Sequence, residues 1–233
     1  MIDVRRADTR FHTKLDWLDS WHSFSFGPHH DPSNRGHGLL LVSNDDRVRA
    51  GAGFPPHAHR DMEIVTWVLA GALAHEDSAG HSGVIHPGLV QAMSAGTGVR
   101  HSEMNASRSE DVHFVQMWVP PDETGRPPRY DQVDVSAALD GGGLVPVASG
   151  QGHDGAIAIG QRAAVLWAAR LAPGDAVEVP DDRHVHVFVP VGEADLEGAG
   201  TLAEGDAARL TDAGPLRLTA GAGGAETLIW ATA

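Results

Sequence analysis

The sequence of 233 residues contains no cysteine. This absence excludes disulfide bridges, zinc sites with thiolate ligands, cysteine-bound iron–sulfur clusters and cysteine nucleophiles. It is also typical of a reducing compartment, so we expect a cytoplasmic protein. Met1–Ser20 lacks the apolar core of a secretory signal. The longest apolar stretch, Ile64–Ala74, has 11 residues and is too short to cross a bilayer, so we expect no membrane association.

Positive charge is scarce. The chain has 17 basic and 31 acidic residues, which gives a formal net charge of −14. Nucleic acids and anionic membrane surfaces attract basic patches, so neither is expected as a direct partner.

Turn-forming residues are frequent, with 28 glycines and 14 prolines. Between them, short runs of apolar and β-branched residues predict strands at Leu39–Ser43, Ile64–Leu69, Val112–Val119, Ala164–Arg170, His184–Val189 and Thr227–Trp230. Only Val135–Leu139 suggests a helical turn. Many short strands at close spacing predict an all-β sandwich or barrel. A glycine-rich segment, Gly141–Gly143, suggests a boundary between an N-terminal domain over residues 1–135 and a C-terminal domain over residues 140–233.

Histidine is abundant and unevenly distributed: 12 of the 15 histidines lie in the first 113 residues. Alternate residues of a strand face the same side, so His57 and His59 form one pair, and His101 and Glu103 form a second. If these strands face each other across a small barrel, three imidazole nitrogens and one carboxylate oxygen converge. That set suits Fe, Mn, Ni, Cu or Zn. Four protein ligands leave two positions of an octahedral ion open for a substrate.

Glu63 is a second candidate for the carboxylate, because it follows His59 by four residues. Glu63 has three interpretations. It is a metal ligand, a group that orients a metal-binding histidine, or a partly buried acid paired with Arg60 or Arg100. The residues alone leave the choice between Glu63 and Glu103 open.

Several segments of the first 130 residues resemble the pirin family, and within it the bacterial pirin-like quercetin dioxygenases. They are Trp17–Phe26, His57–Glu63, Met93–Glu103 and Pro128–Tyr130. The glycines and histidines of residues 51–71 are similar to the first cupin motif, with one extra residue before the last glycine. Residues 96–101 are similar to the end of the second motif, with glycine where proline is usual.

The resemblance implies an all-β bicupin, with two tandem cupin (jelly-roll) β-barrels and a metal ion only in the N-terminal one. Carried over by position, the family's ligands are His57, His59, His101 and Glu103, which favours Glu103 over Glu63. The C-terminal half matches weakly.

Other histidines receive structural interpretations. His184 and His186 repeat the spacing of the first pair, but no second pair follows them, so we interpret them as strand residues. His22 is expected to be a packing residue, and His29–Pro32 to form a loop at the barrel mouth. The remaining histidines of the first half assigned to surface or strand positions are His75, His81, His86 and His113.

The resemblance also implies an activity. This is flavonol 2,3-dioxygenation, in which quercetin and O₂ give a depside and carbon monoxide, with Glu103 as the general base for the flavonol hydroxyl. Fe(II) is the first choice of metal, and Mn, Ni, Cu, Co or Zn fit the same ligands. We expect a monomer.

The alternative to this dioxygenase is a metal-binding, redox-responsive regulatory protein that acts through protein partners. Another cupin chemistry, such as isomerisation or sugar binding, is the third possibility.

Overall fold

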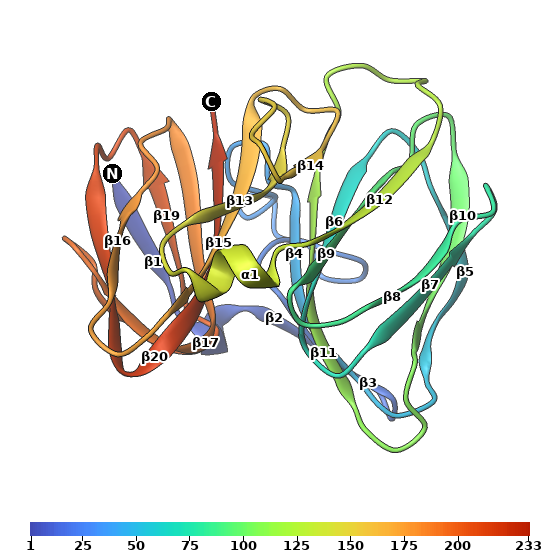
Figure 1. Ribbon diagram of the computed structural model, residues 1–233, viewed down its shortest axis with the longest axis horizontal. Coiled ribbons are helices and arrows are strands. Elements are labelled where there is room, and N and C mark those ends of the chain that lie inside the picture. Colours follow the sequence, from blue (N-terminus) through green and yellow to red (C-terminus); the bar gives the residue numbers. More distant parts are fainter.

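The computed structural model describes residues 1–233 as two β-barrels that lie side by side (Figure 1). The predicted all-β, two-barrel fold is therefore confirmed. No helix of the chain has both the length and the apolar character that crossing a membrane requires.

The N-terminal barrel consists of two facing sheets. The seven-stranded sheet has the order β12-β9-β6-β11-β4-β3-β2. Its strands are β2 (Phe11–Lys14), β3 (Leu18–His22), β4 (Val42–Val48), β6 (Glu63–Ala70), β9 (Leu89–Ser94), β11 (Val112–Val119) and β12 (Arg129–Asp134). The four-stranded sheet has the order β5-β10-β7-β8. Its strands are β5 (Gly53–His59), β7 (Leu73–Asp77), β8 (Ser82–Ile85) and β10 (Val99–Asn105).

The C-terminal barrel is a single sheet that curls over itself. Its own strands are β13 (Val145–Ser149), β14 (Ile157–Ala158), β15 (Ala164–Leu171), β16 (Ala176–Val179), β17 (His184–Leu196), β18 (Gly200–Leu202), β19 (Ala207–Thr211) and β20 (Leu216–Thr232). The long strands β17 and β20 bend where their pairing register shifts on either side of Gly192. Gly192 has φ of +78°, and a Cβ there would lie 2.2 Å from the Gly224 carbonyl oxygen, so the bend requires glycine.

The N-terminal strand crosses between the barrels. Strand β1 (Ile2–Arg5) pairs antiparallel with β19 of the C-terminal sheet, and a short 3-10 turn, η1 (Ala7–Thr9), leads back to the N-terminal barrel. The division at residues 135–140 stays a prediction about domains. Helix α1 (Ser136–Asp140), where the sequence suggested a helical turn, lies in this connection.

Most strands lie where the sequence predicts them, and β11 has the predicted bounds. Leu39–Ser43 is an exception: strand β4 begins at Val42, and Leu40 closes a turn by pairing with His37. Leu40 is fully buried between the barrels. Its apolar character therefore reflects burial of a turn, which a run of apolar residues does not distinguish from a strand.

The largest apolar core lies between the two barrels rather than inside either one. It contains 22 buried residues drawn from both halves of the chain. On β11, Val115 and Met117 contribute to this core, while the alternate residues Gln116 and Trp118 line a cavity of the N-terminal barrel. The indole nitrogen of Trp230 in the second barrel donates to the Met117 sulfur at 3.2 Å. The same strand therefore joins the barrels and supplies the cavity wall.

The interiors of the two barrels differ. A cluster of 17 buried apolar residues belongs to the C-terminal barrel. In the N-terminal barrel the apolar residues form separate clusters of seven and four, and buried polar side chains occupy much of the remaining interior. The N-terminal barrel therefore has an interior suited to binding.

Because the barrels share their largest core, we expect a cavity in it to destabilise the whole protein. Leu166 on β15 is fully buried in this core, and Leu166→Ala should lower the free energy of unfolding by about 2–5 kcal/mol. Urea unfolding followed by tryptophan fluorescence measures the change. Val191→Ala is the control, because Val191 is 42% exposed. A loss below about 1 kcal/mol for Leu166→Ala would contradict the shared core.

Candidate metal centre

The antiparallel pairing of β5 with β10 brings the histidine pairs together. His57 lies directly opposite His101 in the register of the two strands. Because alternate residues share a face, His59 lies on the same side as His57, and Glu103 on the same side as His101. The two pairs lie on neighbouring strands of one sheet rather than on facing sheets. The imidazoles of His57, His59 and His101 form one group whose ligand atoms lie within 4.8 Å of one another, whereas Glu103 forms such a group with His75 and His101.

A bulge adjusts this pairing. Between the His57–His101 pair and the Phe54–Glu103 pair, β5 has one residue more than β10. The bulge contains Pro55 and Pro56, which β5 tolerates because it is the edge strand of its sheet.

Close backbone approach continues beside the bulge. A Cβ on Gly53 would lie 2.4 Å from the Glu103 carbonyl oxygen, so only glycine permits this contact.

Three imidazoles form the first part of the site. The ring centroids of His57, His59 and His101 lie 4.4–4.9 Å apart. The Nδ1 atom of His57 is 2.9 Å from the Pro55 carbonyl oxygen, which leaves its Nε2 free to accept. The Nε2 atoms of His59 and His101 are buried without any hydrogen-bond partner. Buried ring nitrogens without partners are costly, and a cation bound between them would satisfy them, so these residues fit a transition-metal ion.

Burial keeps the imidazoles neutral. It is the largest cause that lowers the pKa of His59 to about 4, with a smaller contribution from the charge of His57. Burial likewise lowers the pKa of His101 to about 3. Both rings therefore present a lone pair at neutral pH, as metal binding requires.

Glu103 lies beside these rings in a different environment. Its side chain is buried, and both carboxylate oxygens accept hydrogen bonds from Gln116 Nε2, at 2.7 and 2.9 Å. The Trp118 indole in turn donates to Gln116 Oε1 at 3.0 Å, which fixes the amide orientation. Burial raises the pKa of Glu103 to about 7, although the Gln116 hydrogen bond opposes this effect. The carboxyl therefore exchanges a proton near neutral pH.

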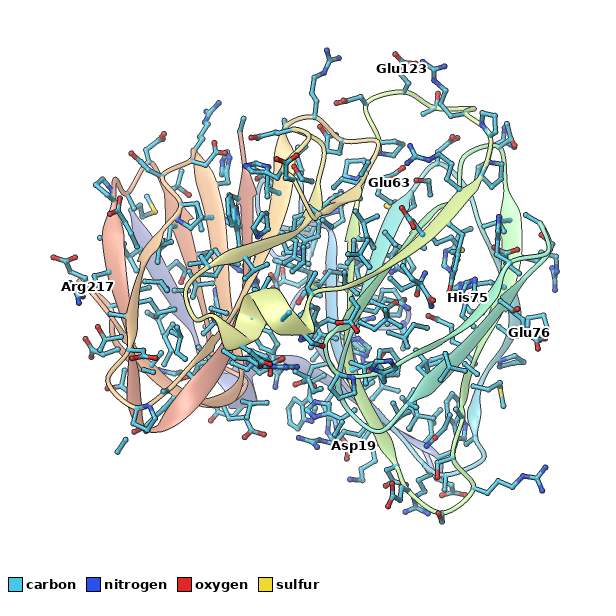
Figure 2. The ribbon with its side chains drawn as sticks, viewed as in Figure 1. Asp19, Glu63, His75, Glu76, Glu123 and Arg217 are labelled. Atoms are coloured by element: carbon cyan, nitrogen blue, oxygen red, sulfur yellow. The ribbon has the colours of Figure 1, made fainter.

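His75, expected from the sequence only at a surface or strand position, is a further residue of this site. It lies on β7 directly opposite Glu103, is fully buried, and its Nδ1 is 3.3 Å from His101 Nδ1. Figure 2 shows His75 within the N-terminal barrel. His75, His101 and Glu103 form a second group that can hold a metal ion, and this group shares His101 with the first. The spacing of His75 and Asp77 on one strand face is the only signal for it in the sequence.

A cavity of about 380 Å³ opens onto the site. Its apolar wall includes Phe26, Phe54 and Trp118. Its polar wall includes side chains of β3 and β4, which lie beside β11 in the seven-stranded sheet: Ser20, His22, Asn44 and Asp46. The cavity is large enough for a small organic molecule and offers it both kinds of surface.

The polar wall is a hydrogen-bonded network. His22 Nδ1 is 2.9 Å from Asn44 Oδ1, and its Nε2 is 3.0 Å from Thr13 Oγ1. The same Thr13 oxygen contacts His29 Nε2 at 2.9 Å, so the loop that carries His29 is joined to the cavity. Gly27 and Pro28 of that loop line the cavity, whereas the residues predicted to lie at the barrel mouth, His29–Pro32, do not. His22 is thus a buried residue with both ring nitrogens hydrogen-bonded, as expected of a packing residue, and it also lines the cavity.

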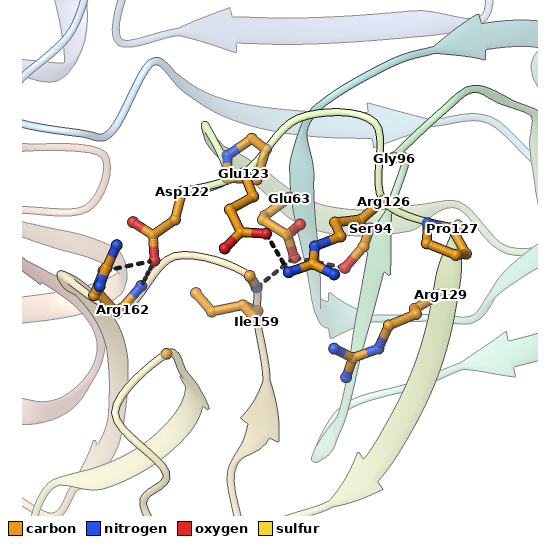
Figure 3. A pocket seen from close by; sticks show the side chains of 13 residues that line it. Glu63, Ser94, Gly96, Asp122, Glu123, Arg126, Pro127, Arg129, Ile159 and Arg162 are labelled. Carbon is orange, nitrogen blue, oxygen red and sulfur yellow. Dashed lines mark hydrogen bonds and ion pairs between the residues drawn. The ribbon is translucent and has the colours of Figure 1, made fainter.

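Glu63, the alternative carboxylate, lies elsewhere. It accepts hydrogen bonds from Ser94 Oγ at 2.6 Å and from the Gly160 backbone N–H at 3.0 Å. These contacts place it at a separate cavity of about 620 Å³ that residues of both halves line (Figure 3). Arg60 pairs with the adjacent Asp61, and Arg100 donates to a backbone carbonyl, so neither pairs with Glu63.

Two family models match the chain. The Pirin model matches residues 4–119, and the model described as the quercetinase C-terminal cupin domain matches residues 146–230. A Mycobacterium tuberculosis protein with the provisional name quercetin 2,3-dioxygenase is 56% identical over 230 residues, covering 98% of this chain and 94% of its own. The quercetin 2,3-dioxygenase of Escherichia coli K12 is 40% identical over 199 residues, covering 85% of each chain.

Solved structures agree with these matches. The crystal structure of YhhW from Escherichia coli has a TM-score of 0.92 and 36% identity, covering 100% of this chain and 98% of its own. A structure described as bacterial pirin YhhW in complex with nickel(II) has a TM-score of 0.90 and 35% identity, covering 99% of this chain and 98% of its own.

Asp46 in the polar wall of the cavity should make the stability of the protein depend on pH. Burial is the main cause that raises the pKa of Asp46 from its ordinary 3.8 to about 7, although the Ser20 hydroxyl donates to it. At a pH between these two pKa values, the Asp46 carboxyl is ionised in the unfolded chain but protonated in the folded protein. The wild type should therefore lose stability relative to Asp46→Asn as the pH rises from about 4 to 7, by up to about 1.4 kcal/mol per pH unit.

Urea unfolding of both proteins at a series of pH values measures this difference. Asp154→Asn, which removes an exposed carboxyl, is the matched control. A constant difference between Asp46→Asn and the wild type would show that Asp46 is ionised in the folded protein.

Proposed function

The chain belongs to the pirin family, and on this premise we propose that it is a metal-dependent dioxygenase that opens flavonols such as quercetin with O₂. One observation carries the proposal. The rings of His57, His59 and His101 converge beside the buried Glu103 carboxyl, at a cavity of about 380 Å³. The Nε2 atoms of His59 and His101 are buried without a hydrogen-bond partner. A closed structural metal site has no such cavity, whereas a catalytic site needs an open position for its substrate.

We assign His57, His59, His101 and Glu103 as the metal ligands. Fe(II) is the first choice, and Mn, Ni, Cu, Co or Zn suit the same nitrogen and oxygen donors. When bound there, such a cation supplies Lewis acidity that lowers the pKa of a coordinated hydroxyl. His75 contacts His101 through its Nδ1, so it is assigned the role of orienting that ring.

Glu103 is also assigned as the general base. When it is not coordinated to the ion, this buried carboxyl has a pKa raised to about 7, and in that state it can accept the proton of the flavonol 3-hydroxyl at neutral pH. Gln116 holds both carboxylate oxygens and thereby limits the rotation of the group that receives the proton. The flavonolate then reacts with O₂, and both oxygen atoms enter the depside as carbon monoxide leaves.

The cavity walls support an aromatic, hydroxylated substrate. Phe54 and Trp118 offer apolar surface for flat rings, while Asn44 and Asp46 offer hydrogen-bonding groups for hydroxyls. Phe26 packs edge-on against Trp118, with ring centroids 5.5 Å apart, and so helps to hold that wall in place.

Metal binding tests the ligand assignment. We expect His101→Ala to lose the metal ion, because it removes a nitrogen common to both candidate groups. Glu103→Gln should retain part of the metal, because the three imidazoles remain. Metal analysis after dialysis gives the stoichiometry. His86→Ala is the control, since His86 is exposed and belongs to neither group, and it should bind like the wild type. Full metal content in His101→Ala would refute the assignment.

Oxygen uptake tests the reaction. Protein loaded with Fe(II), Mn(II), Ni(II) or Cu(II) should consume O₂ and quercetin in equal amounts, and metal-free protein should not. Glu103→Gln should reduce turnover by about 10²–10⁴-fold, as expected for loss of a general base. Glu63→Gln should leave turnover near the wild-type value, because Glu63 lies at the other cavity. Loss of turnover in Glu63→Gln alone would move the carboxylate role to Glu63.

Absence of uptake with every metal, despite stoichiometric metal binding, would exclude quercetin as substrate. It would favour the alternative of a metal-binding regulatory protein that acts through protein partners.

A further inference from the structure

A buried arginine between the barrels forms no ion pair. Arg209 on β19 is only 7% exposed. Its Nη2 donates to the Ser23 carbonyl oxygen at 2.9 Å and to Asn34 Oδ1 at 2.8 Å, and its guanidinium lies 4.5 Å above the Phe24 ring centroid. All three contacts are with neutral groups, and Arg209 forms no ion pair. A buried cation without a nearby anion is costly.

A small cavity of about 20 Å³ adjoins this arginine. Three residues that line it have a buried polar atom without a hydrogen-bond partner: Arg209 Nε, Ser23 Oγ and His186 Nε2. Their side chains belong to residues that are at most 7% exposed. Three such atoms around one cavity indicate a ligand that accepts hydrogen bonds from them.

The remaining charges around the cavity give it an excess of positive charge. Arg5 and Arg10 also line it, but Arg5 is paired with Asp3 at 2.8 Å and Arg10 with Asp45 at 3.0 Å. Arg209 is therefore the cation without an ion pair, since Asp3, which lies opposite it on β1, is already paired with Arg5. This local excess contrasts with the net charge of −14 of the whole chain.

From this geometry we propose that the cavity between the barrels binds a single small anion of about the size of chloride. A volume of about 20 Å³ admits one water-sized species. An anion can accept hydrogen bonds from Arg209 Nε, the Ser23 hydroxyl and His186 Nε2 together, and it also neutralises the guanidinium. A water molecule has two acceptor sites and no charge, so it meets neither need fully.

The position gives the anion a structural consequence. It would join the segment that follows β1, the loop between β3 and β4, and strands β17 and β19 of the second barrel. The same β3–β4 loop carries Phe26 and Gly27 to the wall of the metal-site cavity. Anion binding should therefore stabilise the contact between the barrels, whatever reaction the metal centre performs.

Chloride is the probe for the first experiment. Chlorine NMR line widths in sodium chloride solutions, recorded with the wild type in one fixed metal state, should show broadening that saturates with chloride. Arg209→Met should weaken binding by about tenfold or more, because it removes a charge-assisted donor. Ser23→Ala retains the buried charge and should weaken binding by about three- to tenfold. Any chloride held at the metal centre would be unaffected by either substitution.

Arg108→Met is the matched control, because Arg108 is exposed and lies outside the cavity, and it should broaden the signal like the wild type. If Arg209→Met does not fold, as judged by circular dichroism, Ser23→Ala alone decides. Equal broadening in the wild type and Ser23→Ala would then overturn the proposal.

Crystals grown without halide and soaked in sodium bromide provide an independent test. We expect an anomalous peak in the cavity beside Arg209. Ordered water without an anomalous signal at that position would overturn the proposal. Acetate in place of bromide distinguishes a monoatomic ion from a carboxylate: a carboxylate oxygen in the cavity would also overturn the stated size limit.

Discussion

The packing of one barrel on the other is the interaction on which the rest of this structure depends. Strands β6 and β11 are buried on both faces, so one set of alternate side chains packs on the C-terminal barrel and the other faces the N-terminal interior. The Trp67 indole adds a polar link, since it donates to Glu226 of the second barrel at 2.6 Å. This arrangement holds Gln116 at a fixed place, and through it the carboxyl of Glu103.

Burial has two opposite electrostatic consequences in the N-terminal barrel. It makes protonation unfavourable for His59 and His101, and it makes ionisation unfavourable for Glu103. The same low-dielectric interior therefore prepares neutral nitrogen donors and a carboxyl that exchanges its proton near pH 7. Perturbed pKa values of this kind cluster at functional sites.

The two halves of the chain use a similar barrel differently. In the C-terminal barrel, apolar residues fill the interior, and the repeated histidine spacing yields no convergent group: His186 borders the cavity between the barrels, while His184 packs edge-on against His37. The second barrel is thus mainly a packing partner. It supplies the surface that buries β11, and its Arg209 side chain donates to Ser23 and Asn34 of the β3–β4 loop, which reaches the metal-site cavity.

The sequence by itself determined the all-β fold and the residues that alternate on one strand face, because strand periodicity and turn residues are local properties. It also indicated His57, His59, His101 and Glu103, since each pair needs only the spacing of alternate residues. The tertiary structure decided what depends on residues distant in sequence. It brought His75 opposite Glu103, separated Glu63 from the histidines, and paired β1 with the second barrel. Register and barrel packing decide these contacts, and neither leaves a local pattern in the sequence.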